Sequence, residues 1–558
     1  MGDATPDVIV VGAGLAGLVS TLELLRSGHS VLLLDRCLPE QLGGLAREAF
    51  GGMFMVDSPE QRRSRIPDNE RLALEDWLRI ADFDEGDVWP RRWAEQYVVR
   101  ARDDVGAWLR EIGVHFFPVV NWAERGNFGD GNSVPRFHLT WGTGKALVQA
   151  VWGAIESHPR RGALDLRFRS RVTKLISEEG RIVGARVVAE ESEQADEYEV
   201  RSTKAVVIAA GGIGGNLELI RREWPTSRLG SAPEKLLMGS HYNADGAMHE
   251  EVSRIGGNVT HLSRMWNYAD AVRHPKPQRE HHGLKLIPPR SGIMLNPDGR
   301  RYGPVPVMPT FDAYAALERM CEDERKYSWL ICNFKIAKRE LDVSGSQHNP
   351  SLREKRLVPF LLGVLLGKPV LVRHFLEGSP DFVSAPTLHE LAGKMNEVTG
   401  ESAIDAAVLE REVGRYDETI ARGKGLFNDD QLRRIGQLRN WRGDRLRTSR
   451  FQRIVDAKAM PLIAIRLQVM ARKSLGGIQT DLSCRVLREP TSRPEGAASE
   501  AIPGLFAVGE AAGFGGGGVH GKRSLEGTFL GGCVFTGRLA AANIAGAELP
   551  VRIPPRVD

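Results

Sequence analysis

Apolar residues in the first 35 positions follow two different patterns. Asp7–Val11 (DVIVV) and Ser30–Leu34 (SVLLL) are continuous apolar runs, which are typical of strands buried on both faces of a parallel sheet. Between them, residues 15–27 have helical periodicity, and Gly28 stands where the end of a helix favours glycine. The pattern therefore predicts a strand–helix–strand unit of about 30 residues.

A glycine motif, GAGLAG, joins the first predicted strand to the helix. In this G-x-G-x-x-G pattern, Gly12 permits a tight turn and Gly14 lets a diphosphate come close to the backbone. Gly17 lets the helix pack closely on the strand, and Ala16 precedes it in the motif. The diphosphate then lies at the positive end of the helix dipole. Asp35 follows the second strand and can accept a hydrogen bond from a ribose hydroxyl. These residues predict dinucleotide binding and leave FAD and NAD open.

Two later apolar runs also end in glycine-rich segments. Residues 206–210 (VVIAA) run into GGIGGN, and residues 504–513 (GLFAVGEAAG) predict a strand that ends at Gly509-Glu510. A loop with four glycines follows at 515–518, and the stretch after it has helical character despite its glycines. Small residues there let a flat ring lie against the backbone.

The apolar segment 358–372 (VPFLLGVLLGKPVLV) contains Lys368 and is too short to span a bilayer, so it predicts a buried core helix. If exposed, it would suit a hydrophobic substrate or a membrane surface. The apolar N-terminal run is preceded by Asp3 and Asp7 instead of basic residues, which is unlike a signal peptide. We therefore expect a cytoplasmic protein with no integral membrane segment.

Composition narrows the class of protein further. The chain has 558 residues, of which 42% are hydrophobic and 26% charged, with a formal net charge of +4. This balance excludes a disordered chain and gives no reason to expect a nucleic-acid partner. Five cysteines are scattered without paired spacing, which favours a reducing compartment and predicts no zinc, haem, iron–sulfur or other metal site.

The three glycine motifs together resemble the flavoprotein superfamily of fumarate reductases, succinate dehydrogenases and 3-ketosteroid dehydrogenases. The closest resemblance is to a subgroup of FAD-binding dehydrogenases of similar length. The segments that carry it are MVDSPEQRR (55–63), GNSVPRFHLTWGTG (131–144) and VHGKRSLEGTFLGG (519–532). The resemblance implies an α/β fold: a Rossmann-like FAD-binding domain built from residues 1–235 and 381–558, with an inserted α+β cap domain at 236–380.

The resemblance also implies FAD as the cofactor. Glu510 would bind the ribityl chain, and the helix starting near Leu525 would point its N-terminus at the pyrimidine edge of the flavin. Relatives with covalent FAD attach it to a histidine before a Gly-Gly pair, and Gly43–Gly52 has none, so we expect non-covalent FAD. The expected cofactor residues are Gly12, Gly14, Ala16, Gly17, Asp35, Gly43, Gly44, Gly52, Ala210, Gly211, Gly509, Glu510, Gly527 and Thr528.

The substrate of these relatives does not transfer with the fold. Fumarate reducers have a proton-donating Arg soon after a segment that this chain matches as SGIMLNPDGRRY (291–302), but the next residues here, GPVPVMPTFD, contain no Arg. Their dicarboxylate-binding His and Arg near the flavin become Lys473 and a shifted Arg523. Ketosteroid dehydrogenases carry a Tyr in the C-terminal loop, which this loop lacks. The broken anion-binding pattern favours a hydrophobic ketone, steroid-like or terpenoid, over a dicarboxylate.

Tyr268 and Arg264 occupy the region where the cap domain of this superfamily contributes catalytic side chains. The phenol of Tyr268 can serve as an acid or a base, although a packed aromatic with a satisfied hydroxyl is the alternative. Arg264 would share a face with Tyr268 if the segment is helical. An ion pair is the alternative role for Arg264.

Three further candidates lie near the expected flavin. His520 and Arg523 follow the four-glycine loop, and Lys473 precedes Ser474, where it could polarise the ring edge. The alternatives are that His520 only caps the loop and that Arg523 pairs with Glu526.

The predicted reaction is hydride transfer between flavin N5 and a carbon next to a carbonyl, which forms or removes a C=C bond in a small-molecule substrate. Three rivals stay open: a flavin oxidase or monooxygenase, a catalytically idle flavoprotein acting as a redox partner or sensor, and a nicotinamide-only Rossmann protein. The electron acceptor is also open among a quinone, a carrier protein and oxygen.

Overall fold

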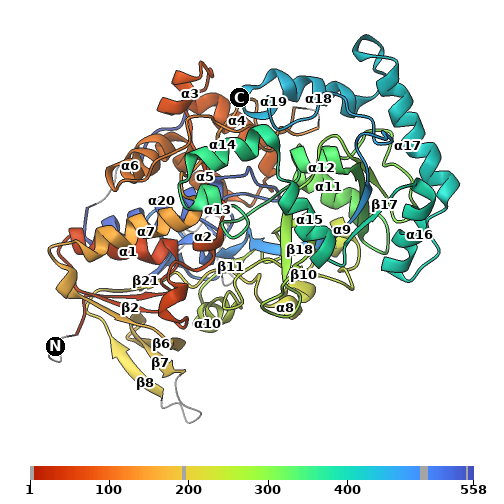
Figure 1. Cartoon of the computed structure of the whole chain (residues 1–558). Helices are drawn as coiled ribbons and strands as arrows, with labels where there is room; N and C mark the ends of the chain where they lie inside the picture. The colour runs from red at the N-terminus through yellow and green to blue at the C-terminus, as the bar shows by residue number, and fades with distance from the viewer. Residues whose placement is uncertain (1–4, 128, 191–196, 491–499, 548–550, 558) are drawn as a thin grey trace.

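The computed structural model describes residues 5–127, 129–190, 197–490, 500–547 and 551–557. Its first sheet, on the left of Figure 1, has the strand order β20-β21-β9-β1-β2-β5. The pairs from β21 to β5 are parallel, and β20 is antiparallel to β21. Its strands are β1 (Val8–Val11), β2 (Val31–Leu34), β5 (Leu164–Arg167), β9 (Ala205–Ile208), β20 (Arg485–Leu487) and β21 (Ala501–Ala507).

The two ends of the chain meet in this part of the molecule. The predicted strand–helix–strand unit is formed by β1, α1 (Leu15–Arg26) and β2, and every residue of both strands is buried. The C-terminal helix α20 (Thr528–Ile544) packs on α1, and the Ser20 hydroxyl donates to the Gly537 carbonyl at 3.2 Å. Helix α7 (Thr143–Glu156) also contacts α1. The N- and C-terminal segments therefore build one α/β unit.

A second sheet of eight strands lies on the right in Figure 1. Its centre is the 13-residue strand β18 (Leu462–Ser474), which pairs with β12 (Met265–Arg273) on one side and with β15 (Tyr327–Asn333) on the other. Helices α11 (Ala313–Cys321) and α16 (Leu388–Thr399) contact this sheet. The other strands are β10 (Leu237–Met238), β13 (Gly283–Ile287), β14 (Ile293–Leu295), β16 (Asp342–Val343) and β17 (Phe382–Ala385).

One hydrophobic core connects the two sheets. Its largest cluster of buried side chains includes Val8 and Val10 of the first sheet together with Ile463 and Ile465 of the second. The two parts of the chain are thus packed against one another. The predicted domain limits, 1–235, 236–380 and 381–558, stay a prediction.

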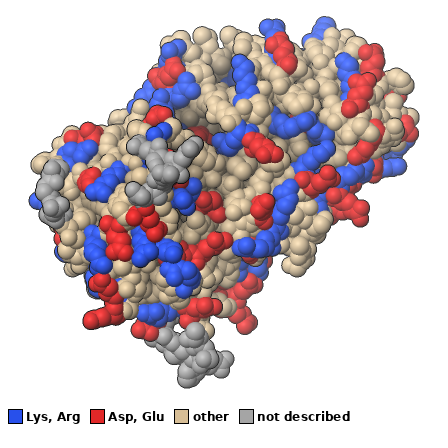
Figure 2. Space-filling model, turned by 90° about the horizontal axis from the view of Figure 1, so that it is seen from below, with Lys and Arg blue, Asp and Glu red and all other residues tan. Residues whose placement is uncertain are grey.

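Three antiparallel strands extend below the first sheet: β6 (Ser170–Glu178), β7 (Arg181–Ala189) and β8 (Glu197–Arg201). On the face shown in Figure 2, basic and acidic side chains are interspersed. The ion pair between Arg201 of β8 and Glu178 of β6, at 2.6 Å, joins the two outer strands of this meander. Such exposed pairs contribute little to stability individually.

The apolar segment 358–372 forms parts of two helices, α14 (Leu357–Leu366) and α15 (Pro369–Gly378). The prediction of a buried core helix is wrong for α14, because none of its residues is buried. Among the described residues, no single helix has both the length and the apolar character to cross a membrane. By length and composition alone, α14 and α15 together pass that test, with a bend of 77° between them.

The structure also corrects the conditional helix at residues 264–268. Met265–Tyr268 belong to strand β12, so Arg264 and Tyr268 do not share a helix face. The remaining helices are α2 (Gly44–Glu48), α3 (Pro59–Arg63), α4 (Glu70–Ala81), α5 (Val88–Arg100), α6 (Trp108–Glu111), α8 (Leu217–Arg222), α9 (Thr226–Leu229), α10 (Ala247–Arg254), α12 (Phe334–Glu340), α13 (Pro350–Arg353), α17 (Ala406–Ala421), α18 (Asp430–Asn440) and α19 (Arg442–Arg445). The short strands are β3 (Gly52–Phe54), β4 (Phe137–Leu139), β11 (Val259–Thr260) and β19 (Gly477–Ile478).

Candidate active site

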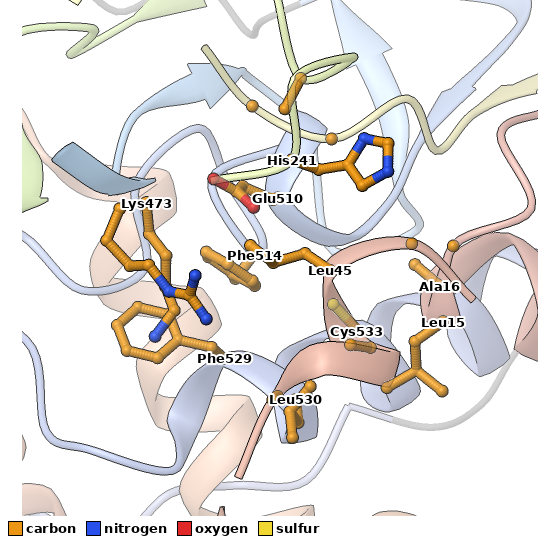
Figure 3. A pocket seen from close by; sticks show the side chains of 18 of the residues that line it. Leu15, Ala16, Leu45, His241, Lys473, Glu510, Phe514, Phe529, Leu530 and Cys533 are labelled. Atoms are coloured by element: carbon orange, nitrogen blue, oxygen red, sulfur yellow. The ribbon is translucent and has the colours of Figure 1, made fainter. Parts of the chain in front are cut away.

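A cavity with about 2420 Å³ of empty space, part of it open to solvent, is lined by residues of both sheets. In Figure 3, Leu15 and Ala16 lie at one end of the view and Lys473 and Phe529 at the other. The cavity therefore extends from the N-terminus of α1 to the end of β18.

The first glycine motif forms one end of this cavity. Gly12 has φ +106°, and a Cβ there would lie 2.5 Å from the Ala209 carbonyl oxygen, so only glycine fits the turn. A Cβ on Gly14 would meet no protein atom within 4 Å, because this position faces open space. Gly14 is the N-cap of α1, and no described side chain caps that end. The N–H groups of the first turn are thus available to a diphosphate.

Asp35 stands at the end of β2 and lines the same cavity. Its Oδ2 accepts a hydrogen bond from the Ala13 N–H at 2.5 Å, and its Oδ1 accepts one from the Cys37 N–H at 2.7 Å. These bonds fix the carboxylate beside the glycine turn. Each oxygen keeps a second lone pair for a ligand hydroxyl.

The cavity brings together most of the residues expected to bind FAD. Gly43 N–H donates to the Ala13 carbonyl at 3.0 Å, which joins the second glycine segment to the first. Gly17, Gly509 and Thr528 lie outside the lining. The predicted residues that line it are Gly12, Gly14, Ala16, Asp35, Gly43, Gly44, Gly52, Ala210, Gly211, Glu510 and Gly527.

Glu510 projects into the middle of the cavity (Figure 3). Its Oε1 accepts a hydrogen bond from the Ser474 N–H at 2.9 Å, and burial raises the pKa of its carboxyl. The Ser474 hydroxyl accepts a hydrogen bond from the Ile213 N–H at 2.8 Å. The end of β18 is therefore attached to two of the predicted cofactor-binding segments.

A buried acid–base pair lies where β12 and β18 reach the cavity. The Tyr268 hydroxyl donates to Glu526 Oε1 at 2.6 Å, and Trp266 Nε1 donates to the same oxygen at 3.3 Å. Trp266 and Tyr268 reach one carboxylate because residues two apart on a strand share a face. Both Tyr268 and Glu526 line the cavity.

Two partly buried lysines flank this pair. Lys473 Nζ lies 3.5 Å from the centre of the Phe529 ring, and Lys285 Nζ lies 3.2 Å from Asp270 Oδ2 and 4.5 Å from the centre of the Tyr268 ring. Burial lowers the pKa of Lys473 to about 8. Burial has the same effect on Lys285, but Asp270 and Glu526 outweigh it and raise the pKa of that lysine.

The same surroundings act in opposite directions on the two members of the pair. Burial raises the pKa of the Glu526 carboxyl, but Lys473 and Lys285, with the two hydrogen bonds, outweigh this effect, and the net shift is downward. Burial and the Glu526 charge hold the pKa of Tyr268 well above its usual value. At neutral pH the proton resides on Tyr268 and the negative charge on Glu526. The arrangement can transfer a proton and stabilise negative charge on a bound molecule.

A further carboxyl, Glu124, lines the cavity. Its Oε2 accepts a hydrogen bond from the Ala313 N–H at 3.0 Å, and burial, with Asp312 and Glu526 nearby, holds its pKa well above the usual range. Sequence reasoning missed Glu124, Lys285 and Glu526 as site residues. Glu526 lies within the segment VHGKRSLEGTFLGG, which carries the family resemblance, and this position could have marked it as a site residue.

Arg264 does not reach the cavity lining. Its guanidinium lies 2.7 Å from Asp84 Oδ2 and 2.8 Å from Asp87 Oδ2. The structure thus gives Arg264 the alternative role of an ion-pair partner and brings only Tyr268 and Lys473 of the predicted catalytic set to the lining.

His520 and Arg523 also lie outside the lining. His520 is buried, its Nε2 is 2.8 Å from the Thr528 hydroxyl, and burial with nearby Lys473 lowers its pKa to about 3. Arg523 pairs with Asp312 at 2.6 Å and with Asp130 at 3.3 Å. The alternative that Arg523 pairs with Glu526 is wrong, because Glu526 faces Tyr268.

Comparison with known proteins adds the family. Residues 7–530 match the family described as FAD binding domain. A KsdD-like steroid dehydrogenase from Mycolicibacterium smegmatis (strain ATCC 700084 / mc(2)155) is 43% identical over 564 residues, covering 97% of this chain and 100% of the relative. The expected superfamily resemblance is thus confirmed at the level of sequence.

Two solved structures share the fold. One is 3-ketosteroid Δ1-dehydrogenase from Sterolibacterium denitrificans in complex with 1,4-androstadiene-3,17-dione, with a TM-score of 0.69, 16% identity and coverage of 98% of this chain and 100% of that chain. The other is the open conformation of a flavocytochrome c3 fumarate reductase, with a TM-score of 0.65, 22% identity and coverage of 98% and 79%. These likenesses confirm the predicted α/β fold class.

Proposed function

The chain belongs to the FAD binding domain family, and from this premise we propose that it oxidises a CH–CH bond next to a ketone in a hydrophobic, steroid-like substrate. The observation that carries the proposal is the Tyr268–Glu526 hydrogen bond of 2.6 Å beside the expected FAD site. The relative that is 43% identical is named a KsdD-like steroid dehydrogenase, which supports the substrate class.

The residues of the cavity fit FAD. Gly12 and Gly14 leave room for a diphosphate at the N-terminus of α1, and Asp35 offers carboxylate oxygens to a ribose. Glu510 stands between Ala16, at the N-terminus of α1, and Lys473 (Figure 3), whose Nζ lies 5.9 Å from the centre of the Tyr268 ring. When bound, FAD supplies the hydride acceptor. We propose that it is held without a covalent bond, because Gly43–Gly52 contains no histidine.

Tyr268 and Glu526 form a proton relay in this proposal. Oxidation of a CH–CH bond next to a carbonyl releases a hydride and a proton, and the proton needs an acceptor. Tyr268 Oη takes the proton from the substrate carbon while its own proton passes to Glu526 Oε1. A buried phenolate, which the raised pKa of Tyr268 makes costly, therefore never has to form.

Lys473 and Lys285 have a second task once the proton has reached Glu526. The carboxyl is then neutral, so Lys473 can stabilise the developing negative charge on the carbonyl oxygen, with a smaller contribution from Lys285, which stays paired with Asp270. Lys473 contacts an aromatic residue of the lining, because its Nζ lies 3.5 Å from the centre of the Phe529 ring. Both lysines line the cavity.

Two arginines of the cavity already face a carboxylate of the protein. Arg290 and Arg447 line the cavity, and both face Asp444, at 3.3 Å and 3.8 Å. A dicarboxylate would have to compete with this buried carboxylate for the arginines. A ketone needs only the lysines and the tyrosine.

The relay is tested with Tyr268→Phe, Glu526→Gln and the double variant, assayed for dehydrogenation of a ketosteroid with an artificial electron acceptor. We expect each single variant to lose about 10²-fold or more in kcat, because a positioned acid–base group contributes that much. The double variant should lose no more than the single ones, since the two residues act as one unit.

Tyr302→Phe is the matched control, because Tyr302 is also buried and hydrogen-bonded, to the Ser328 hydroxyl at 2.7 Å, but lies outside the cavity lining. Flavin absorbance of each preparation verifies that the cofactor content is unchanged. A Tyr268→Phe enzyme as fast as the Tyr302→Phe enzyme, at equal flavin content, would contradict the relay. Oxygen consumption with NADPH, in place of ketone-dependent turnover, would favour the monooxygenase rival.

A further inference from the structure

Helix α14 carries its apolar side chains on the outside of the molecule, where it runs across the surface in Figure 1. The exposed positions come in pairs four residues apart, which places them on one helix face. We call these residues the α14 apolar face: Leu357, Val358, Leu361, Leu362, Leu365 and Leu366. Soluble helices turn charged or polar residues to this side, whereas the sequence of α14 (LVPFLLGVLL) contains no polar residue.

The inner side of α14 is anchored to the wall of the cavity. The Phe360 ring lies 5.1 Å from the Phe117 ring and 5.9 Å from the Trp141 ring. Phe117 N–H donates to the Leu139 carbonyl at 2.7 Å, and Leu139 lines the cavity. The α14 apolar face is therefore a fixed part of the surface just outside the candidate active site.

Basic residues stand at both ends of α14. Arg353, Lys355 and Arg356 precede it and Lys368 and Arg373 follow it, while Glu354 is the single acidic residue of segment 353–373, which gives this segment a formal charge of +4. Glu354 is shared, because it lies 2.8 Å from Arg353 and 2.7 Å from Arg356. Lys368 pairs with Asp342 at 2.5 Å. The excess of positive charge therefore lies mainly before the helix, and an apolar face next to such a basic segment matches a bilayer that carries anionic headgroups.

We propose that the α14 apolar face docks on the surface of an anionic phospholipid bilayer. Ten residues of helix are about 15 Å long, half of the roughly 30 Å hydrocarbon core of a bilayer. The chain then turns by 77° into α15. Helix α14 thus lies in the plane of the interface, with its leucines among the acyl chains and the basic residues that precede it at the phosphates. The docking does not depend on the proposed reaction.

The test is co-sedimentation of the full-length protein with vesicles of phosphatidylcholine that contain either no or 30% phosphatidylglycerol. We expect binding to the anionic vesicles that weakens as salt is raised from about 0.05 to 0.5 M. Leu361→Asp/Leu366→Asp should lower the partition coefficient by at least about tenfold, because two side chains lose their burial. Lys355→Gln/Arg356→Gln should reduce the preference for anionic vesicles.

The matched control is Leu426→Asp/Val455→Asp. These two residues are 67% and 42% exposed, against 68% and 44% for Leu366 and Leu361, and lie outside α14. Flavin absorbance and melting temperature verify that all variants are folded. The proposal is overturned if the wild-type protein stays in the supernatant with both vesicle types, or if both pairs of variants bind alike. It is also overturned if the protein does not bind vesicles and Leu361→Asp/Leu366→Asp converts an oligomer into monomers. In that case a second copy of the chain would cover α14.

Discussion

Tyr268 and Glu526 share one hydrogen bond, and their surroundings place the proton on the tyrosine. Burial raises the pKa of Tyr268, while Lys473 and Lys285 lower that of Glu526. Lys473 is the group of this cluster whose charge changes near neutral pH, because burial lowers its pKa to about 8. It is cationic below this pH and neutral above it.

The pH dependence of turnover should follow Lys473. If its positive charge stabilises the oxyanion, kcat falls as the pH rises through about 8, where the lysine loses its proton. Lys473→Arg should keep kcat high to at least about pH 10, because a guanidinium stays charged there. Stopped-flow reduction of the flavin by a ketosteroid between pH 6 and 10 measures this. An unchanged fall near pH 8 in the Arg variant would assign the titration to another group.

At the scale of single residues, the sequence predicted part of this cluster. Tyr268 and Lys473 were recognised because they stand where the superfamily places catalytic or flavin-edge side chains. Glu526 was considered only as an alternative ion-pair partner of Arg523, three residues before it, and in the structure Arg523 pairs with Asp312. The carboxylate that pairs with an arginine is determined by the tertiary fold. Asp312 is more than 200 residues away from Arg523 in the sequence, so this pair could not be predicted from local spacing.

At the scale of elements, the contact between α1 and α20 joins the two ends of the chain. Gly537 lies in close contact with α1, and a Cβ there would be 2.8 Å from the Ala16 carbonyl oxygen. Ala16 also lines the cavity, so this contact sets the position of the N-terminus of α1.

Gly537→Ala should therefore lower the melting temperature, because the new methyl group meets backbone, at a cost of about 1–3 kcal/mol. Gly153→Ala, in the last turn of α7, is the control: a Cβ there meets no atom within 4 Å. It should raise stability by roughly 0.5–1 kcal/mol, the propensity difference between alanine and glycine in a helix. Thermal melts monitored by circular dichroism compare the two. Shifts in the same direction would refute the close packing at Gly537.

Element predictions succeeded where pattern and burial agree. The continuous apolar runs at β1 and β2 are buried strands, as predicted, because a parallel sheet covers both of their faces. The apolar segment 358–372 was expected to be buried by the same logic, yet α14 is not. Hydrophobicity predicts that a surface will be removed from water. It does not predict whether the rest of the chain or a lipid bilayer will cover that surface.

At the scale of the whole molecule, FAD would join segments from both ends of the chain. The expected contacts are at Gly12–Ala16, Gly43–Gly52 and Ala210 on one side, and at Glu510 and Gly527 on the other. The α/β class and the joining of the chain ends were predictable from three glycine motifs in order. The course of the second sheet was not, because β18 pairs with strands spread from β10 to β17.

Added FAD should raise the melting temperature of the apoprotein in a concentration-dependent way, because a ligand of the folded state stabilises it by mass action. After heat denaturation, the yellow flavin should appear in the supernatant, as non-covalent binding requires. Visible absorbance of both fractions measures this. His241 lines the cavity, so a flavin that stays with the pellet would point to covalent attachment, with this histidine as a candidate.

Strand β18 ties the proton-transfer cluster to the cofactor site at the level of neighbouring residues. Lys473 lies beside Phe529 and faces Tyr268, while Ser474, next in sequence, bonds to Glu510 and to Ile213. Successive side chains of a strand point to opposite faces, so a shift of one residue exchanges them. Among homologous sequences, residues 462–474 should therefore show amino-acid replacements but no insertions or deletions. Length variation among relatives then belongs to the loops at either end of this strand.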